Sequence, residues 1–304
     1  MRVLLTGARG QVGSALHPRL AQLGEVIAPD RNSLDLAVRV QIEDALARFE
    51  PELILNCAAY TQVDQAEEEL ERAHAINTAA PAILAEWAAR HSVPLVHFST
   101  DYVFDGSGLR PWTERDEPRP LSAYGRTKLA GESAVSGSGA PHLIVRTSWV
   151  YAAQGRNFLR AIAARALEKP ELQVVSDQFG APTSASLIAD ALAQIIARHR
   201  SDLPSGFARA HGVCHVAASG ETSWHGFAYA IVEGLRERGV PLACRSIVPV
   251  ATADYPAKAA RPLNSRLSTE RLAAVYGLVT PHWRAALVPV LNEYAAALAK
   301  VQAG

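Results

Sequence analysis

Tyr124 and Lys128 are the residues whose types and spacing point most directly to chemistry. Side chains four residues apart lie on the same face of a helix, so this phenol and this ammonium group would be neighbours. A phenol with its ordinary pKa near 10 is a poor proton shuttle at neutral pH, and a nearby cation favours its ionised form. The pair therefore predicts a tyrosine general acid whose pKa Lys128 lowers.

A second set of polar groups, Ser99, Thr100 and Asp101, follows an apolar run that predicts a strand at residues 94–99. Open α/β sheets bind ligands at the carboxyl ends of their strands. A hydroxyl group there can donate to a carbonyl oxygen on which negative charge develops. The alternative is that Thr100 and Asp101 only close a turn. With Tyr124 downstream, we expect Thr100 to polarise a substrate ketone.

Three glycines, Gly7, Gly10 and Gly13, stand between the first expected strand and the first expected helix. Because glycine has no Cβ, a pyrophosphate can approach the backbone, and the N–H groups of the following helix favour an anion. Glycines at this spacing between a strand and a helix predict a dinucleotide site.

Asp30 and Arg31 end the second expected strand, where an acidic side chain conventionally binds the adenosine ribose. Arg31 could instead hold a 2′-phosphate. Both residues could also belong to a solvated turn. The sequence therefore leaves NADH and NADPH open as the cofactor.

Short apolar runs alternate with helical patterns through the first half of the chain. Strands are expected at residues 2–6, 25–29, 53–57, 94–99 and 142–147, and helices at 11–23, 38–49, about 64–91 and from about Tyr124. Strands that are apolar throughout need cover on both faces, and strict strand–helix alternation favours parallel pairing. The pattern predicts an α/β protein with a Rossmann-type doubly wound parallel sheet.

The second half is less regular. It is expected to contain helices at residues 157–169, 187–200 and 224–238 and a strand at 212–217, with prolines interrupting the remainder from 241 to 289. We expect residues 1–150 to form the NAD(P)-binding domain, to which later segments return. Residues 151–304 would mainly form a smaller C-terminal α/β substrate domain.

Composition excludes several classes of protein. The chain has 304 residues with 30 basic and 30 acidic side chains, and 49% of its residues are hydrophobic. This much apolar surface excludes an extended disordered chain, and a zero net charge argues against a nucleic-acid partner. No stretch reaches the roughly 20 apolar residues of a membrane helix, and no signal-peptide pattern follows the first residue. We expect a cytoplasmic protein with no membrane partner.

Several segments resemble known enzymes. Residues 6–13, 99–104, 124–132 and 146–151 resemble the extended short-chain dehydrogenase/reductases. Residues 147–151 (TSWVY), 177–183 (DQFGAPT) and 261–267 (RPLNSRL) are similar, more narrowly, to the dTDP-4-dehydrorhamnose reductase family. The resemblance covers nearly the whole chain. It implies NAD(P)H-dependent reduction of the C4 ketone of dTDP-4-dehydro-L-rhamnose, the last step of dTDP-rhamnose biosynthesis for cell-surface polysaccharides such as the lipopolysaccharide O-antigen.

The motifs and the resemblance together give a set of expected site residues. Those expected at the cofactor are Gly7, Gly10, Gln11, Val12, Gly13, Asp30, Arg31, Asp35, Leu36, Ala59, Tyr60, Thr61, Phe98, Tyr124 and Lys128. Those expected at the nucleotide-sugar substrate are Thr100, Asp101, Trp149, Asn157 and Arg266. Tyr124, Lys128 and Thr100 are the expected catalytic residues, with Trp149 as a wall of the sugar pocket. By contrast, Trp224 and its aromatic neighbours are interpreted as core residues.

One departure from the family concerns a metal. Some members place glutamates that hold magnesium at a dimer contact, and the matching positions here are Ala15, Ser186 and Glu293. A hard divalent cation needs several oxygen ligands, and only one carboxylate remains. No metal is therefore expected, and the protein is expected to be a monomer or a weak homodimer.

Two other functions remain open at this stage. The chain could be a related nucleotide-sugar epimerase or dehydratase, which retains its oxidised cofactor. It could also be a non-catalytic regulatory subunit that binds a dinucleotide, although such a subunit has no need of Thr100, Tyr124 and Lys128 together.

Overall fold

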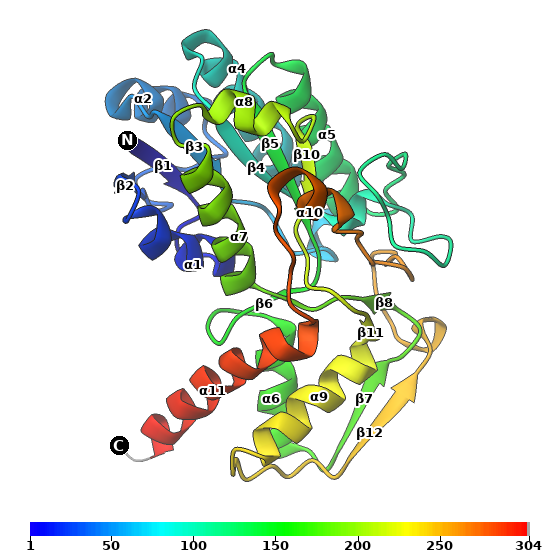
Figure 1. Cartoon of the computed structure of the whole chain (residues 1–304). Helices are drawn as coiled ribbons and strands as arrows, with labels where there is room; N and C mark the ends of the chain where they lie inside the picture. The colour runs from blue at the N-terminus through cyan, green and yellow to red at the C-terminus, as the bar shows by residue number, and fades with distance from the viewer. Residues whose placement is uncertain (303–304) are drawn as a thin grey trace.

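A parallel β-sheet forms the centre of the protein, whose computed structural model describes residues 1–302 (Figure 1). Its strands have the order β10-β5-β4-β3-β1-β2, and every neighbouring pair is parallel. They are β1 (Arg2–Thr6), β2 (Glu25–Ile27), β3 (Leu53–Asn56), β4 (Leu95–Thr100), β5 (His142–Thr147) and β10 (Val213–His215). The strand order reverses between β1 and β3, which is the point where such sheets bind ligands. The predicted Rossmann-type sheet is confirmed.

Helices cover both faces of this sheet. Successive side chains of a strand point to opposite faces, so Val3 and Leu5 belong to one hydrophobic cluster and Leu4 to another. The first cluster includes α1 (Gln11–Leu20) and α7 (Ala185–Arg198), and the second includes α2 (Arg39–Phe49), α4 (Ala80–His91) and α5 (Ala123–Gly137). The sheet is thus doubly wound, with α7 and β10 supplied by the second half of the chain.

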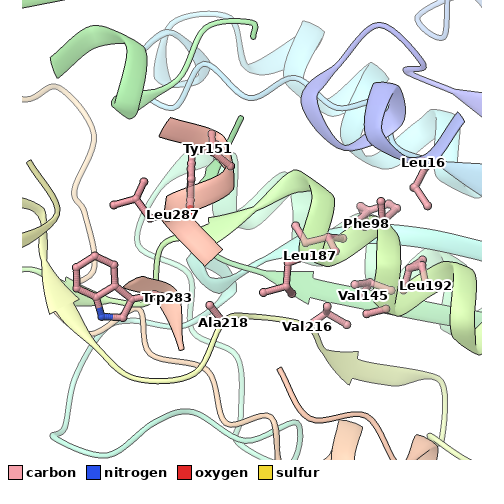
Figure 2. Packing of buried hydrophobic residues seen from close by; sticks show 14 of the residues in the cluster. Leu16, Phe98, Val145, Tyr151, Leu187, Leu192, Val216, Ala218, Trp283 and Leu287 are labelled. Atoms are coloured by element: carbon pink, nitrogen blue, oxygen red, sulfur yellow. The ribbon is translucent and has the colours of Figure 1, made fainter. Parts of the chain in front are cut away.

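Most of the remaining elements lie beneath the sheet in the view of Figure 1 or connect the two parts, whereas α8 (Leu203–Ala208) and α10 (Glu270–Tyr276) pack beside the sheet, against β5 and β10. The others are α6 (Phe158–Glu168), α9 (Trp224–Arg236) and α11 (Trp283–Gln302), the parallel pair β7 (Glu171–Val175) and β12 (Ser246–Val250), and the short strands β6 (Val150–Tyr151), β8 (Phe179–Gly180), β9 (Thr183–Ser184) and β11 (Thr222–Ser223). Figure 2 shows Trp283 and Leu287 of α11 in the same hydrophobic cluster as Phe98 and Val145 of the sheet. One continuous core therefore joins the lower elements to the sheet.

The helix expected at about 64–91 is interrupted. The structure has a 3₁₀ turn at Gln65–Glu67, a short helix α3 (Leu70–His74), a π-helical turn at Ala75–Ala79, and only then α4. Asn77 in the π-helical turn exchanges two hydrogen bonds with the backbone of Tyr60, at 2.8 and 3.0 Å. This tertiary contact accompanies the local change of helix type, which apolar periodicity alone does not reveal.

Several elements of the second half were not predicted: α8, α10, α11, β7, β12 and the short strands β6, β8, β9 and β11. Proline inside a helix removes a backbone donor, so the prolines of this region indicated irregular chain. Pro289 nevertheless lies within α11, whose Leu287, Leu291 and Tyr294 are buried. The other predicted elements begin and end within three residues of the observed ones. Among the described residues, no helix combines the length and apolarity needed to cross a lipid bilayer.

Candidate active site

The expected catalytic groups meet at the carboxyl end of β4. Thr100 is the last residue of that strand, and α5 begins at Ala123, so that Tyr124 lies in its first turn. The Ser122 hydroxyl accepts a hydrogen bond from the N–H of Gly125 at 3.1 Å and caps the helix. A Cβ on Gly125 would lie 2.2 Å from the Tyr102 carbonyl oxygen, so only glycine lets α5 start here. The Tyr124 phenol lies near enough to the Thr100 side chain for Thr100 to lower its pKa.

Tyr124 is more weakly acidic than the sequence predicts. Burial raises its pKa to about 12, while the hydrogen bond with Thr100 opposes the rise. Lys128 is not among the groups that shift this pKa, so the expectation that Lys128 lowers it is wrong for this structure. The physical reason is that burial disfavours the phenolate and that the negative charge of Asp101 adds to the rise. A phenol of this kind keeps its proton at neutral pH, which suits a proton donor.

Lys128 is 1% exposed and lies one turn after Tyr124 on α5. Its Nζ donates a hydrogen bond to the Phe98 carbonyl oxygen at 2.6 Å. Burial lowers the Lys128 pKa to about 8, and the negative charge of Glu132 opposes this shift. The ammonium form is therefore lost at a lower pH than for an ordinary lysine.

Buried polar groups without partners surround the ends of β4 and β5. Ser99 Oγ, Thr147 Oγ1 and Asp101 Oδ2 are all inaccessible and have no hydrogen-bond partner within residues 1–302. Burial raises the Asp101 pKa to about 6. Buried polar groups are nearly always paired in folded proteins, so a cluster of unpaired ones fits a polar ligand at this place.

The glycine loop between β1 and α1 has the geometry that close contact with a phosphate requires. Gly7 has a φ of 67°, and a Cβ on it would lie 2.6 Å from the Ala58 backbone nitrogen. A Cβ on Gly13 would lie 2.2 Å from the Gly7 carbonyl oxygen. Gly10 precedes the first turn of α1, where Gln11 carries an unpaired buried Oε1. These features fit a dinucleotide pyrophosphate at the helix N-terminus.

At the adenosine end, Asp30 is held in place by its own turn and by Arg9. Its Oδ1 accepts hydrogen bonds from the N–H groups of Asn32 and Ser33, both at 3.1 Å, and these bonds contribute to lowering its pKa. Its Oδ2 pairs with the Arg9 guanidinium at 2.9 Å. Arg31, expected near a 2′-phosphate, is exposed and makes no ion pair with Asp30. Sequence reasoning did not consider Arg9, although its position between two glycines of the loop was the available signal.

The remaining expected cofactor residues lie on neighbouring segments of the same sheet edge. Asp35 and Leu36 follow β2, whereas Ala59, Tyr60 and Thr61 follow β3. Parallel strands bring these two loops to one edge, beside the glycine loop. Val12 lies in the first turn of α1, and Phe98 lies on β4 with 8% exposure.

A cleft of about 550 Å³ lies between Tyr102, two residues after the end of β4, and the lower elements. Its lining includes Tyr102, Gln178 and Trp224 and three basic side chains, Arg165, Lys258 and Arg261. Arg261 pairs with Asp64 at 2.7 Å, and Lys258 pairs with Glu68. The cleft thus combines an aromatic ring with positive charge, a combination suited to a nucleotide diphosphate.

Two tryptophans exchange the roles expected of them. Trp224, interpreted as core, lines the cleft, and Trp149, expected as a pocket wall, lies behind it with 8% exposure. The two rings stack with centroids 3.6 Å apart and planes 11° apart. Phe227, one turn along α9, is fully buried as expected. Only the packing of α9 against α6, α11, β7, β11 and β12 decides which ring faces the cleft.

The structure gives Asn157 and Arg266 structural roles. Asn157 caps α6 through a bond from the N–H of Arg160 at 3.1 Å, and its Nδ2 donates to the Ala152 carbonyl at 2.9 Å. Arg266 pairs with Glu221 at 2.8 Å and donates to Asn264 Oδ1 at 2.8 Å. Neither residue lines the cleft, and their expected substrate contacts stay a prediction.

The three positions considered for magnesium do come together. Ala15, Ser186 and Glu293 line one pocket of about 390 Å³. Glu293 is the only carboxylate among them, and no group of three or more His, Cys, Asp or Glu side chains in the described chain could hold a metal ion. The donor set does not fit a hard divalent cation.

Comparisons with known proteins agree with this geometry. A family model described as the RmlD substrate binding domain matches residues 1–296. The dTDP-4-dehydrorhamnose reductase of Escherichia coli K12 is 43% identical over 299 residues, which cover 96% of this chain and 98% of that protein. The spore coat polysaccharide biosynthesis protein SpsK of Bacillus subtilis is 38% identical and covers 97% of this chain and 99% of its own. A crystal structure of the dTDP-4-dehydrorhamnose reductase of Bacillus anthracis in complex with NADP has a TM-score of 0.86 at 32% identity and covers 96% of this chain and 99% of that one.

Proposed function

The chain belongs to the RmlD substrate binding domain family, and from this membership we propose that it is an NAD(P)H-dependent dTDP-4-dehydrorhamnose reductase. The reaction would reduce the C4 ketone of dTDP-4-dehydro-L-rhamnose to the alcohol of dTDP-L-rhamnose. The observation that carries this proposal is that Thr100, at the end of β4, and Tyr124, in the first turn of α5, lie next to each other. Tyr124 and Lys128 share a helix face, which completes the set.

In this reaction the chain's own residues supply the proton and the positioning. A bound reduced nicotinamide supplies the hydride. Tyr124 Oη donates its proton to the substrate oxygen at C4 as negative charge develops there, and Thr100 Oγ1 stabilises that charge. The raised pKa of Tyr124, about 12, keeps the phenol protonated until the stronger alkoxide base forms. Lys128 would hold the cofactor ribose with an N–H that its contact with the Phe98 carbonyl leaves free.

The two halves of the chain divide the binding. We propose that residues 1–150 bind the dinucleotide and that residues 151–304 mainly bind the nucleotide sugar. Arg165, Lys258 and Arg261 would attract the diphosphate, whose binding energy orients the reacting carbon from a distance. We also propose that the enzyme acts in the cytoplasm as a monomer or weak homodimer. Because the relative SpsK is named for spore coat polysaccharide biosynthesis, we propose a similar destination for the product.

Oxidation of NADPH and NADH in the presence of enzymatically generated dTDP-4-dehydro-L-rhamnose tests the proposal. We expect one mole of cofactor to be oxidised for each mole of keto sugar consumed. Sugar conversion without net cofactor oxidation would instead indicate the epimerase or dehydratase alternative. A protein that binds dinucleotide, lacks both activities and requires a partner protein would fit the regulatory alternative.

Arg9 is expected to set the preference for NADPH. The Arg9 side chain is 82% exposed, so it can leave Asp30 and bind a 2′-phosphate. Without Arg9, the 2′-phosphate would face the Asp30 carboxylate with no cation beside it. Arg9→Ala should raise the KM for NADPH about tenfold, the effect of losing about one charge-assisted hydrogen bond, and leave the KM for NADH nearly unchanged. Steady-state kinetics with both cofactors measures this. Arg31→Ala is the matched control, and a larger effect from that variant would assign the 2′-phosphate to Arg31.

Trp224 is expected to bind the nucleotide base. Stacking of a base on an aromatic ring contributes about 1–3 kcal/mol, so Trp224→Ala should raise the substrate KM at least about tenfold with little change in kcat. Trp224→Phe should retain most of the affinity. Tyr229→Ala, at an exposed position of the same helix, serves as the control. An unchanged KM in Trp224→Ala would show that the base binds elsewhere.

A further inference from the structure

We propose that His97 is a positioning residue for Lys128, whose ammonium group donates to His97 Nε2, and this inference rests on the proposed reductase function. His97 lies on β4, the strand that ends in Thr100, and its Nε2 is 3.3 Å from Lys128 Nζ. The imidazole is fully buried, and its other nitrogen does not face solvent either. The contact joins the centre of the sheet to the catalytic helix.

A second buried contact fixes the other side of the imidazole. His97 Nδ1 is 3.1 Å from Asn56 Nδ2, and Asn56 Oδ1 is 2.6 Å from the Thr6 hydroxyl. All three side chains are at most 2% exposed. Thr6, Asn56 and His97 come from the adjacent strands β1, β3 and β4. They therefore form a row of buried contacts across the sheet, and His97 connects this row to Lys128 on α5.

Counting donors shows which arrangement suits a charged lysine. An ammonium group has three N–H donors and no acceptor, so His97 Nε2 must carry a lone pair and Nδ1 must carry the proton. Nδ1–H then needs an acceptor, which Asn56 provides if its amide oxygen faces the imidazole and its amide nitrogen faces Thr6. The oxygen and nitrogen of an amide are assigned from such networks, and exchanging them leaves both distances in hydrogen-bond range. In this arrangement the His97 Nδ1–H and the Lys128 N–H that faces Nε2 both have acceptors.

The close approach of α5 to β4 depends on Gly131. A Cβ at this position would lie 2.1 Å from the Asn77 carbonyl oxygen and 3.5 Å from His97 Nε2. The glycine therefore lets the helix pack closely enough for Lys128 to reach the imidazole. With one N–H donated to the Phe98 carbonyl and one to His97, Lys128 keeps one N–H for a ligand.

The charged groups around Lys128 do not replace this contact. Glu132, one turn along α5, is held by Arg146 through two hydrogen bonds at 2.8 and 2.6 Å. Burial raises the pKa of the Cys57 thiol, which stays neutral. Burial together with the Lys128 charge holds the His97 pKa well below its ordinary value, so the imidazole is neutral as well. His97 therefore contributes a neutral acceptor that fixes the direction of the Lys128 ammonium group.

Two substitutions of His97 separate its two contacts. In His97→Gln, the side-chain amide reaches the place of Nε2 and can accept from Lys128, whereas in His97→Asn it reaches only the place of Nδ1 and can contact Asn56. An accepted hydrogen bond stabilises the ammonium form, so its loss lowers the Lys128 pKa. We expect the fall of kcat/KM at high pH to begin about one unit lower in His97→Asn, with the KM for NADPH raised about tenfold. In His97→Gln the pH profile should stay close to that of the unaltered enzyme.

Thermal unfolding of both variants checks that each is folded, since each loses one contact of a buried group. Equal pH profiles and equal KM values in the two variants would overturn the proposal. If the unaltered enzyme showed no reductase activity, the proposed reductase function would be overturned instead, so the two failures are distinguishable.

A measurement on the unaltered enzyme reports the His97 tautomer and needs a variant only to assign the signal. Nitrogen-15 NMR of labelled histidines, with the His97 signal assigned by its loss in His97→Gln, reports the tautomer directly. We expect the proton on Nδ1 at pH 7, where Lys128 is charged. A proton on Nε2 at that pH would mean that Lys128 does not donate to His97, and it would overturn the proposal.

Discussion

Tyr124→Phe is expected to lower kcat for reduction of the keto sugar by about three orders of magnitude, because general acid catalysis contributes about 10²–10⁴-fold. The substitution removes the donated proton and also the interaction between the phenol and the Thr100 side chain. The aromatic ring remains, so the packing of α5 and the affinity for NADPH should change little. Single-turnover kinetics with bound NADPH measures the chemical step alone.

Tyr102→Phe is the control for this variant. The Tyr102 ring meets Tyr124 edge-on, with centroids 5.6 Å apart, and it lines the same cleft. Its phenol contacts Arg261 rather than Thr100, so its loss should affect the substrate KM more than kcat. If Tyr124→Phe kept more than about a tenth of kcat with normal NADPH binding, Tyr124 would not be the acid.

Lys128→Met is expected to lower kcat/KM about 100-fold, comparable to the loss of one preorganised donor. The substitution should also remove the fall of kcat/KM at high pH. Burial lowers the Lys128 pKa to about 8, so the ammonium form predominates below that pH and is lost as pH rises through it. Since kcat/KM reports groups of the free enzyme, kcat/KM of the unaltered enzyme should fall above about pH 8.

The methionine variant should have low activity without this fall, because no lysine remains to lose a proton. Lys169→Met, at the exposed end of α6, should leave both the rate and the profile unchanged. A fall near pH 8 that persists in Lys128→Met would mean that another group causes it and that Lys128 has a structural role only.

Much of the fold could be predicted because its local patterns agree with its tertiary structure. The apolar runs of β1, β3 and β4 need cover on both faces. The tight turn from β1 into α1 requires glycine, because a Cβ there would clash with the backbone. The broken helix before α4 could not be predicted, since the bonds between Asn77 and the Tyr60 backbone are tertiary. Helix α11 was missed because burial of its apolar face compensates for Pro289.

The site could be predicted in position but not in its electrostatics. Strand ends and helix spacing indicate that Thr100, Tyr124 and Lys128 share one edge of the sheet. They do not indicate how strongly burial raises the pKa of Tyr124, because burial depends on the elements that cover it. Similarly, the pairing of Arg9 with Asp30 and the exchange of roles between Trp149 and Trp224 depend on contacts between segments distant in sequence.

Transfer of deuterium from labelled NADPH tests the central claim most directly. NADPH carrying deuterium at C4 of the nicotinamide, in the position that the enzyme transfers, is mixed with dTDP-4-dehydro-L-rhamnose, and the product is examined by mass spectrometry and proton NMR. Our account predicts a single deuterium at C4 of the rhamnose ring, with the hydroxyl proton drawn from solvent through Tyr124. A product without deuterium from either labelled form of the cofactor, or with deuterium at another carbon, would contradict it.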